Sequence, residues 1–257
     1  MQIITLTTDW NHSDYYAGII RAYLIGALSD FQVVDITHGI PVFDYKRACF
    51  VVKSVYKYFP ANTVHIIGVR GTKNKMPAPP IASRHNNQWF FGYDNGAFTQ
   101  MFDNEKNLEY WYLPCKDDST FPEFDYLVKP AVAIISGADI RELGIELRVY
   151  TNARINLPAF TDDSITGVVE YIDGYGNAIT NIDKRDFERI GNGRRFQIFA
   201  AKRNNVICKI SKSYNEQNSE LIAIFNVLER LEIVQMNYKA NLSLGISIDS
   251  PVYIKFL

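Results

Sequence analysis

The sequence predicts an α/β fold in two parts, with an N-terminal layered α/β domain and a small C-terminal β-barrel domain. Strand-like and helix-like patterns alternate through the first part, as in a sheet with helices on its faces. Short strand-like runs separated by Gly, Asn and Ser fill the last part. Between them, Thr151 to Pro158 lacks a hydrophobic period and ends in proline. We therefore expect an α/β domain over 1–150, a linker over 151–164 and a β-barrel over 165–257.

The elements of the first part follow from their periodicities. Residues 2–7 predict a buried strand, and 15–29 repeat apolar residues at helical spacing. The other elements expected here are strand 31–36, a helix over 44–58 opened by Asp44, strand 63–68, strand 88–92, a short helix after Asn95-Gly96 and strand 108–113. The apolar run 128–136 suits a helix or a strand, and Pro130 favours a helix that begins there.

The last part shows short strands and no helix-length period. The strands expected here are 166–172, 195–200, 206–211, 219–225, 230–234 and 252–256. Their length and spacing are typical of a small barrel or sandwich.

Charge and composition exclude several classes of partner. The chain has 27 basic and 28 acidic residues, so no broad field favours nucleic acid or an anionic membrane. No apolar stretch is long enough to span a bilayer, and the strand-like start leaves no room for a signal peptide. The widely spaced Cys49, Cys115 and Cys208 resemble reduced thiols. We expect a cytoplasmic protein without membrane or nucleic-acid partners.

Several common catalytic patterns are absent. The sequence has no Gly-rich phosphate loop and no nucleophile elbow, and its four histidines lack metal-ligand spacing. We therefore expect no metal, and chemistry that depends on positioning and desolvation.

Two carboxylates stand in the loop that connects the first strand to the first helix. Asp9 and Asp14 lie in the stretch TTDWNHSD, where the loops of an open α/β sheet bind ligands. A carboxylate there can accept two hydrogen bonds from a sugar diol. The alternative is structural: Asp14 caps the helix and Asp9 ends the strand. The loop alone leaves both open.

A second polar loop lies in IDGYGNAITNI, residues 172–182. Its glycines permit tight turns, while Asp173 and Asn177 could receive the ammonium and carboxylate of an amino acid. An Asx-rich turn between strands is the alternative that composition favours.

Weaker candidates follow the other strands. His38 could act as an acid or base, although a loop histidine is more often a structural hydrogen-bonder. Phe43 could stack on a planar ligand or simply pack in the core. The turn 94–96, Asp-Asn-Gly, would open a helix.

Taken in order, five segments resemble the S-adenosyl-L-methionine hydroxide adenosyltransferases, relatives of the fluorinases and chlorinases. The segments are TTDWNHSDYYAG (7–18), VDITHGIPVFD (34–44), YFPANTVHIIGV (58–69), DNG (94–96) and IDGYGNAITNI (172–182). The resemblance implies an α/β domain followed by a barrel. It also implies a homotrimer whose nucleoside site lies between one subunit's N-terminal domain and a neighbour's C-terminal domain.

The resemblance also implies roles for the substrate-binding residues. Asp9 would grip the ribose hydroxyls, Asp14 and Asp173 would receive the methionine ammonium, and Asn177 would lie near the methionine. Phe43 would pack against the ribose or adenine. The adenine-recognising segment would run from Asn226 to Ala240, where this chain has Val227, Glu229 and Arg230 in place of the family's usual Ser-Gly-Tyr.

The reaction implied is displacement at C5′ of S-adenosylmethionine, which is a substrate, so no cofactor is expected. Water or halide would attack in line and methionine would leave, giving adenosine or a 5′-halo-adenosine. Holding the reactants aligned and desolvated would supply most of the acceleration.

The chain departs from the hydrolases at the residues thought to prepare water. Their VDPGVG-like turn is replaced by IIGVRGT (66–72), which has no carboxylate, and Pro122 stands where their histidine would stand. Three hypotheses follow. The chain is an adenosyl-transferring enzyme that uses Arg70 or His38 to hold water or an anion, a non-catalytic S-adenosylmethionine or adenosine binder, or an interaction protein that keeps only the scaffold. The retained binding residues argue against the third hypothesis. We favour the first, with the binder as the alternative, because fluorinase-type relatives also work without that Asp and His.

Overall fold

A computed structural model describes residues 1–73, 76–102, 108–116, 118–148, 150–151, 156–200, 206–216 and 220–257. The chain forms two compact units, Met1–Ile155 and Asn156–Leu257. Their boundary falls within the range expected as a linker. Residues 152–155 of that range, and residue 219 of one expected strand, lie outside the described residues.

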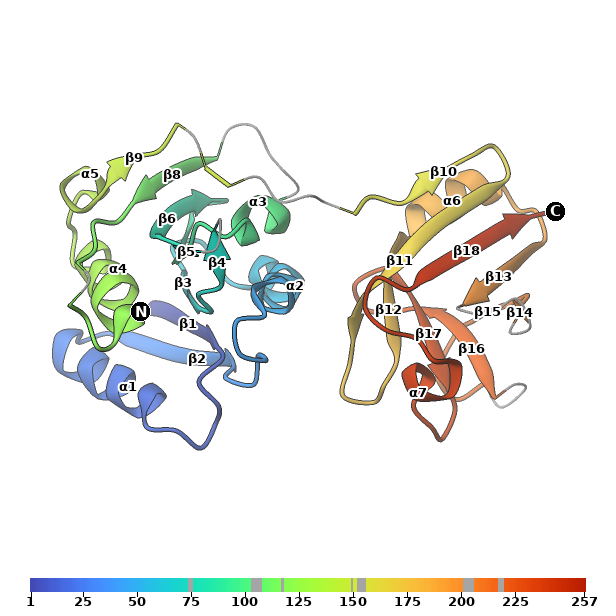
Figure 1. The fold of residues 1–257 in the computed structure, drawn as a ribbon, viewed down its shortest axis with the longest axis horizontal. Helices are drawn as coiled ribbons and strands as arrows, with labels where there is room; N and C mark the ends of the chain where they lie inside the picture. The colour runs from blue at the N-terminus through green and yellow to red at the C-terminus, as the bar shows by residue number, and fades with distance from the viewer. Residues whose placement is uncertain are drawn as a thin grey trace. The chain divides into compact units, whose positions relative to one another are not determined.

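The first unit is built on one mixed sheet (Figure 1). Its strands are β1 (Gln2–Thr8), β2 (Phe31–Thr37), β3 (Val64–Gly68), β6 (Pro80–His85), β7 (Gln88–Tyr93), β8 (Glu109–Tyr112) and β9 (Ile145–Glu146). Their order is β2-β1-β3-β7-β6-β8-β9. The first four in that order are parallel, and β6, β8 and β9 continue the sheet antiparallel. A separate ribbon pairs β4 (Thr72–Lys73) with β5 (Met76–Pro77).

Helices cover both faces of this sheet. They are α1 (Tyr16–Ala27), α2 (Tyr45–Val55), η1 (Tyr56–Tyr58), α3 (Ala97–Met101), η2 (Phe124–Val128), α4 (Lys129–Ile135) and α5 (Ile140–Leu143). One core joins α1 and α4 to Leu6 and Ile66, which are paired neighbours on β1 and β3. The other core joins α2 and α3 to Ile67, whose side chain points to the opposite face because strands alternate.

The strand order creates a switch point between β1 and β3. The chain passes from β1 through α1 to β2 on one side, then through α2 to β3 on the other side of β1. The connections from β1 and to β3 therefore run on opposite sides of β1, and open α/β sheets bind ligands at the carboxyl ends of the strands at such a switch point. Asp9 follows β1 directly, and Arg70 follows β3.

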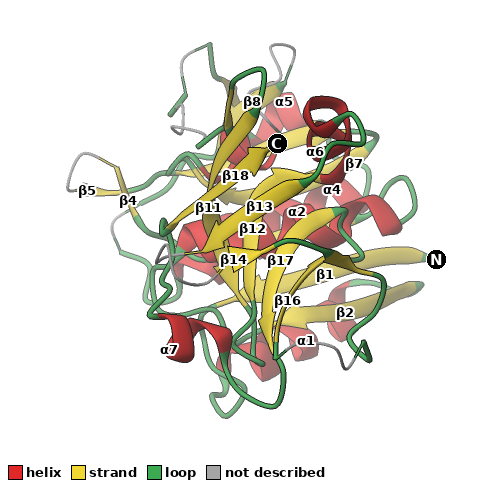
Figure 2. Cartoon of the chain, turned by 90° about the vertical axis from the view of Figure 1, so that its right-hand side faces the viewer, coloured by secondary structure: helices red, strands yellow, loops and turns green. Residues whose placement is uncertain are grey.

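The second unit is a strongly curved, nearly barrel-shaped sheet. Its strands are β10 (Ala159–Phe160), β11 (Ser164–Ile172), β12 (Ala178–Asp183), β13 (Phe196–Ala200), β14 (Val206–Ile207), β15 (Ile210–Ser211), β16 (Leu221–Phe225), β17 (Arg230–Gln235) and β18 (Pro251–Phe256). Their order is β14-β13-β18-β11-β12-β17-β16-β15, with β10 paired to β11. Figure 2 shows β18, β11 and β12 side by side in this unit.

Two helices complete the second unit, α6 (Lys184–Gly191) and α7 (Ala240–Leu244). The turn between β11 and β12 contacts the start of α7, where the Asn241 backbone N–H donates to the Gly176 carbonyl at 2.9 Å. Gly176 has φ of +82°, and a Cβ there would lie 2.5 Å from the Lys239 Cβ. Only glycine fits this approach without strain.

The expected layered α/β domain and barrel are confirmed, and the run 128–136 is helical, as its proline favoured. The sequence missed the longer strands β6 and β12, the two-residue strands β4, β5, β9 and β10, and the helices α5, α6 and α7. The single strand expected over 206–211 is divided into β14 and β15, which pair with different neighbours. The linker expected over 151–164 extends too far toward the C-terminus, because β10 lies within that range and pairs with β11 of the second unit. Among the described residues, no helix is both long and apolar enough to cross a membrane.

Candidate functional site

The carboxylate of Asp9 is fixed at the switch point. Its Oδ2 accepts a 2.8 Å hydrogen bond from the Phe43 backbone N–H. That N–H is presented by a left-handed backbone, with φ of +63° at Phe43. Partial burial raises the pKa of Asp9, while the Phe43 N–H and Asp9's own N–H act in the opposite direction. The Phe43 ring is 66% exposed, so it is not part of a packed core.

A second carboxylate, Glu123, lies in the same region. The Tyr93 hydroxyl, at the end of β7, donates to its Oε1 at 2.9 Å. A Cβ on Gly68, the last residue of β3, would lie 3.3 Å from the Glu123 Cγ. The carboxylate thus sits over the carboxyl ends of β3 and β7. Burial raises the pKa of Glu123, and the nearby Asp9 carboxylate raises it further.

Arg70 supplies the positive charge of this cluster. Its guanidinium carbon lies 5.6 Å from the centre of the Tyr93 ring. Its Nε is buried and has no hydrogen-bond partner among the described residues. Arg70 also lowers the pKa of Glu123 and of Tyr93, although burial dominates and raises both. We call Asp9, Arg70, Tyr93 and Glu123 the carboxyl-end cluster.

Sequence reasoning found Asp9 and Arg70 but missed Glu123 and Tyr93. Glu123 stands one residue after Pro122, the position at which the family's histidine would stand. Its polar side chain beside the aromatic Phe121 and Phe124 was the available signal. Tyr93 ends an apolar strand, and nothing in its surroundings distinguishes it from a core tyrosine.

Asp14 does not cap α1. The N-cap position is Tyr15, and no side chain caps this helix. Asp14 is exposed, and within the described part of the chain its carboxylate makes no hydrogen bond or ion pair. The structural alternative to ligand binding is therefore wrong for Asp14, which remains available to a ligand.

His38 is buried, with 3% of its surface exposed. Its Nδ1 shares a 2.7 Å hydrogen bond with the Thr8 hydroxyl. Its Nε2 lies 3.3 Å from an Asp35 oxygen but makes no hydrogen bond within the described residues. Burial lowers the pKa of His38, and Arg21 and His12 lower it further. These contacts favour the structural role over the catalytic one.

The Asp-Asn-Gly turn, residues 94–96, is hydrogen-bonded to the backbone of the carboxyl-end cluster at Arg70. The Asn95 Nδ2 donates to the Arg70 carbonyl at 3.1 Å, which ties this turn to the loop after β3. Asp94 accepts a 2.7 Å hydrogen bond from the Thr151 backbone N–H. Gly96, with φ of +91°, is the N-cap of α3, so the expected helix-opening turn is confirmed.

In the second unit, Asp173 organises its own turn. Its Oδ1 accepts from the Tyr175 and Asn177 backbone N–H groups, both at 2.9 Å, and its Oδ2 accepts from the Asn177 side chain at 3.2 Å. This is the Asx-rich turn that composition favoured. It does not exclude a ligand, because each carboxylate oxygen has more than one acceptor site.

A pocket of about 690 Å³ opens beside this turn. Its lining includes Asp173, Asn177, Tyr214, Tyr238 and Lys239. Behind it lies Glu232, which is 3% exposed and accepts hydrogen bonds from Tyr214 and Asn226. Burial raises the pKa of Glu232 and raises that of Tyr214 to about 12.

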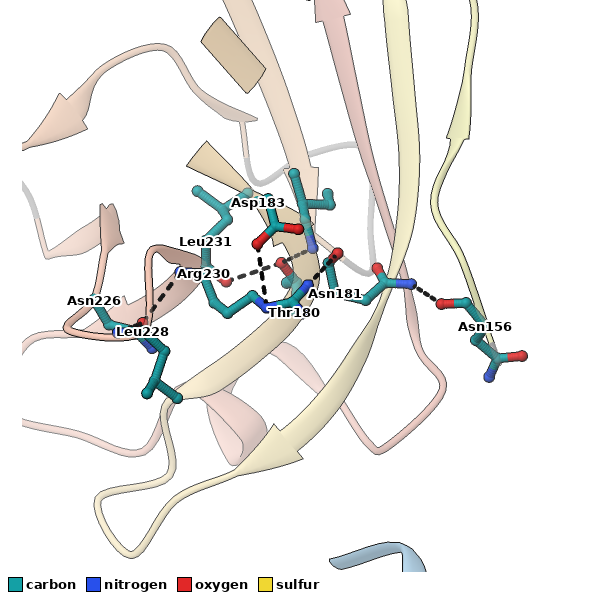
Figure 3. Close-up of polar contacts among 9 residues, drawn as sticks. Asn156, Thr180, Asn181, Asp183, Asn226, Leu228, Arg230 and Leu231 are labelled. Carbon is teal, nitrogen blue, oxygen red and sulfur yellow. Dashed lines mark hydrogen bonds and ion pairs between the residues drawn. The ribbon is translucent and has the colours of Figure 1, made fainter. Parts of the chain in front are cut away.

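Asn226 and Arg230 hold a turn together (Figure 3). The Asn226 Oδ1 accepts from the Leu228 and Arg230 backbone N–H groups. The Arg230 guanidinium pairs with Asp183 at 3.4 Å and donates to the Asn181 carbonyl at 2.8 Å. The polar groups of both side chains therefore make contacts within the second unit that stabilise its fold. Ala240, at the start of α7, is fully buried.

No group of three or more His, Cys, Asp or Glu side chains in the described ranges is arranged to hold a metal ion. The two polar clusters described above, one in each unit, are the candidates for binding a ligand.

Comparison with known proteins assigns the class. The profile of the SAM hydroxide adenosyltransferase N-terminal domain matches residues 4–144, and that of the C-terminal domain matches residues 167–253. The chain belongs to the SAM hydroxide adenosyltransferase family.

Named relatives of the chain are consistent with this assignment, and a solved structure shares its fold. An (R)-S-adenosyl-L-methionine hydrolase from Methanocaldococcus jannaschii is 26% identical over 246 residues, which are 91% of this chain and 88% of the relative. A fluorinase from an Actinoplanes species is 21% identical over 76% of each chain. In fold, the chain resembles an uncharacterized conserved protein from Thermotoga maritima, with a TM-score of 0.84, 20% identity and coverage of 99% of this chain and 100% of that one.

Proposed function

We propose that this protein binds S-adenosyl-L-methionine and transfers its adenosyl group from sulfur to water or a halide. The products are methionine and either adenosine or a 5′-halo-adenosine. The observation that carries the proposal is the Asp9 carboxylate, held by the Phe43 N–H at the switch point of a chain that matches both domains of the family. Relatives named as hydrolases and fluorinases support the same class of transfer.

The roles of the binding residues follow the chemistry of the ligand. Asp9 accepts hydrogen bonds from the ribose diol, and the exposed Phe43 ring packs against the nucleoside. Asp14 and Asp173 bind the methionine ammonium, and Asn177 contacts the methionine. Asn226 and Ala240 shape the adenine segment through its backbone, because the Asn226 side chain is engaged and the Ala240 side chain is buried.

The reaction needs no covalent intermediate on the protein. The nucleophile attacks C5′ opposite the sulfonium, the C5′–S bond breaks, and its electron pair stays on the sulfur of methionine. The leaving group becomes a neutral thioether, so its departure needs no general acid, and holding the reactants in line away from bulk water favours the displacement.

Calorimetry and product analysis test the proposal. The wild-type protein should bind S-adenosylmethionine and adenosine, and overnight incubation should release methionine together with the nucleoside product. Chromatography with and without chloride identifies that nucleoside. Failure to bind either ligand would remove the proposal.

A second candidate function is binding without turnover. It is favoured by one departure from the family pattern, Pro122, because proline can neither donate nor accept a proton through its side chain. Tight binding of S-adenosylmethionine with the substrate recovered intact would establish this function in place of the first.

We further propose a homotrimer in which the N-terminal unit of one subunit and the C-terminal unit of another contact the same ligand. Sedimentation should give the mass of three chains. Co-expression of the variants Asp9→Ala and Asp173→Ala then tests the shared site. In randomly mixed trimers, about a quarter of the sites would carry neither substitution, so activity should reappear. No recovery would contradict sharing between subunits.

A further inference from the structure

The Glu123 carboxylate lies where burial disfavours its charged form. It is taken partly out of water beside a second carboxylate, Asp9, and each raises the energy of the other's charged form. The only side chain in the described residues that donates to it is Tyr93. Partial burial of two neighbouring carboxylates, to each of which one other residue is shown to donate, costs the fold energy when both are charged. Such an arrangement is typical of a functional site.

We propose that the Glu123 carboxylate holds the attacking water of the adenosyl transfer and accepts its proton, with the Tyr93 hydroxyl fixing the carboxylate's orientation. The inference rests on the proposed function and assigns water as its nucleophile. Glu123 is then a catalytic residue, and Tyr93 is a positioning residue.

The step balances without a redox partner. The water oxygen forms a bond to C5′ while the C5′–S bond breaks and leaves its electron pair on the sulfur of methionine. One proton of the water passes to Glu123 and is later released to solvent. The other proton remains on the new 5′-hydroxyl of adenosine.

Three features of the cluster suit this step. Burial makes Glu123 a stronger base than an exposed glutamate, because its pKa is raised. Tyr93 is tied to the sheet at the end of β7, so its hydroxyl holds one carboxylate oxygen in place at 2.9 Å. The buried Nε of Arg70, which has no partner in the described part of the chain, offers a further donor beside the Tyr93 ring for the water or the ribose.

The charges of the cluster also select the nucleophile. Asp9 and Glu123 place two carboxylates where only the Arg70 cation is shown to balance them. A chloride or fluoride ion entering beside Glu123 would meet repulsion from both, whereas neutral water would not. Chloride should therefore neither be incorporated nor compete with water.

The central test compares Glu123→Gln with the wild type in turnover of S-adenosylmethionine. Gln keeps the size and one acceptor oxygen but cannot take the proton. We expect kcat to fall by about 100- to 10,000-fold while KM and the affinity for adenosine change little. Asp125→Asn is the matched control. It removes a carboxylate from the same segment, but the Asp125 carboxylate accepts hydrogen bonds from Lys129 and Ser119, which lie outside the carboxyl-end cluster. Its activity should match the wild type.

The pH profile supplies a second readout. The charged or titratable groups that act on Glu123 are Asp9, Arg70 and Tyr93, and Glu123 in turn acts on Tyr16 of α1. The wild-type kcat should rise with pH through the raised pKa of Glu123, and Glu123→Gln should lose this dependence. Tyr93→Phe removes a hydrogen bond that stabilises the carboxylate, so the rise should move to higher pH.

The outcomes separate this inference from the proposed function. Wild-type turnover combined with unchanged kcat in Glu123→Gln would overturn the role of Glu123 and leave the adenosyl transfer intact. Equal losses in Asp125→Asn and Glu123→Gln would also overturn it, because the effect would then belong to the segment. A wild type that binds but never turns over would overturn both.

Discussion

The polar clusters of the two units differ in how far their side chains are already satisfied. In the second unit, the Asp173 carboxylate accepts three hydrogen bonds from its own turn, and Glu232 accepts from Tyr214 and Asn226. In the first unit, Asp9 accepts one hydrogen bond from the backbone of another segment, and Glu123 accepts one from the Tyr93 hydroxyl. The Nε of Arg70 has no hydrogen-bond partner among the described residues.

This difference indicates a division of work. Side chains that are satisfied within their own turn present a fixed shape and cost little when no ligand is bound. Donors without an acceptor and neighbouring like charges raise the energy of the ligand-free protein. A reactant that binds there can accept those hydrogen bonds or separate those charges. We therefore expect the second unit to contribute recognition and the first unit to contribute the chemistry.

The largest effect on stability should come from the turn in the second unit. Gly176→Ala should lower the free energy of unfolding by about 2–4 kcal/mol, because the new Cβ clashes with Lys239 and the positive φ becomes strained. Gly174→Ala is the matched control, since a Cβ there meets nothing within 4 Å. Thermal denaturation of both variants decides the matter. Equal shifts in melting temperature would show that the turn is not tightly constrained.

A smaller effect, on binding alone, should distinguish the two carboxylates after β1. Asp9→Ala should weaken the binding of adenosine by ~1.5–3 kcal/mol, as for hydrogen bonds to a charged group. Asp14→Ala should leave adenosine binding unchanged, because the proposed partner of Asp14 is the methionine ammonium, which adenosine lacks. It should weaken the binding of S-adenosylmethionine by less than about 5-fold, because Asp14 is exposed. Titration calorimetry with both ligands measures this. Similar losses for adenosine in both variants would contradict the assigned roles.

The smallest effect should come from the titration of Glu232. Its pKa is raised by burial in the folded protein, so folding favours the protonated form. The resulting stability is present below the ordinary glutamate pKa and is lost as pH rises through the raised value. Relative to Glu232→Gln, the wild type should therefore gain stability on acidification over this window. Urea denaturation at several pH values measures it, and parallel curves would argue against a raised pKa.

Local sequence patterns predicted most of the first unit because its strands and helices carry strong periodicity. The parallel strand 63–68 and the helix opened by Asp44 are examples, and Asp44 does accept the Arg47 N–H as a cap. In the second unit, the helix over Lys184–Gly191 was missed because its few apolar residues pack against the barrel without a long apolar repeat.

The candidate site was predicted only where a motif marked it. Asp9 could be found because it follows an apolar run and opens a loop. Glu123 could not, because its meaning depends on Tyr93 and Gly68, which lie 30 and 55 residues away in the sequence. Conversely, the Asn226 and Arg230 side chains belong to the fold. Asn226 holds its own turn and donates to Glu232, and Arg230 is occupied by Asn181 and Asp183 of β12.

Product analysis in ¹⁸O-labelled water with chloride present tests the central claim most directly. Mass spectrometry of the nucleoside formed from S-adenosylmethionine should show adenosine with one ¹⁸O at its 5′-oxygen, together with unlabelled methionine. A 5′-chloro-adenosine, or adenosine without the label, would contradict the account.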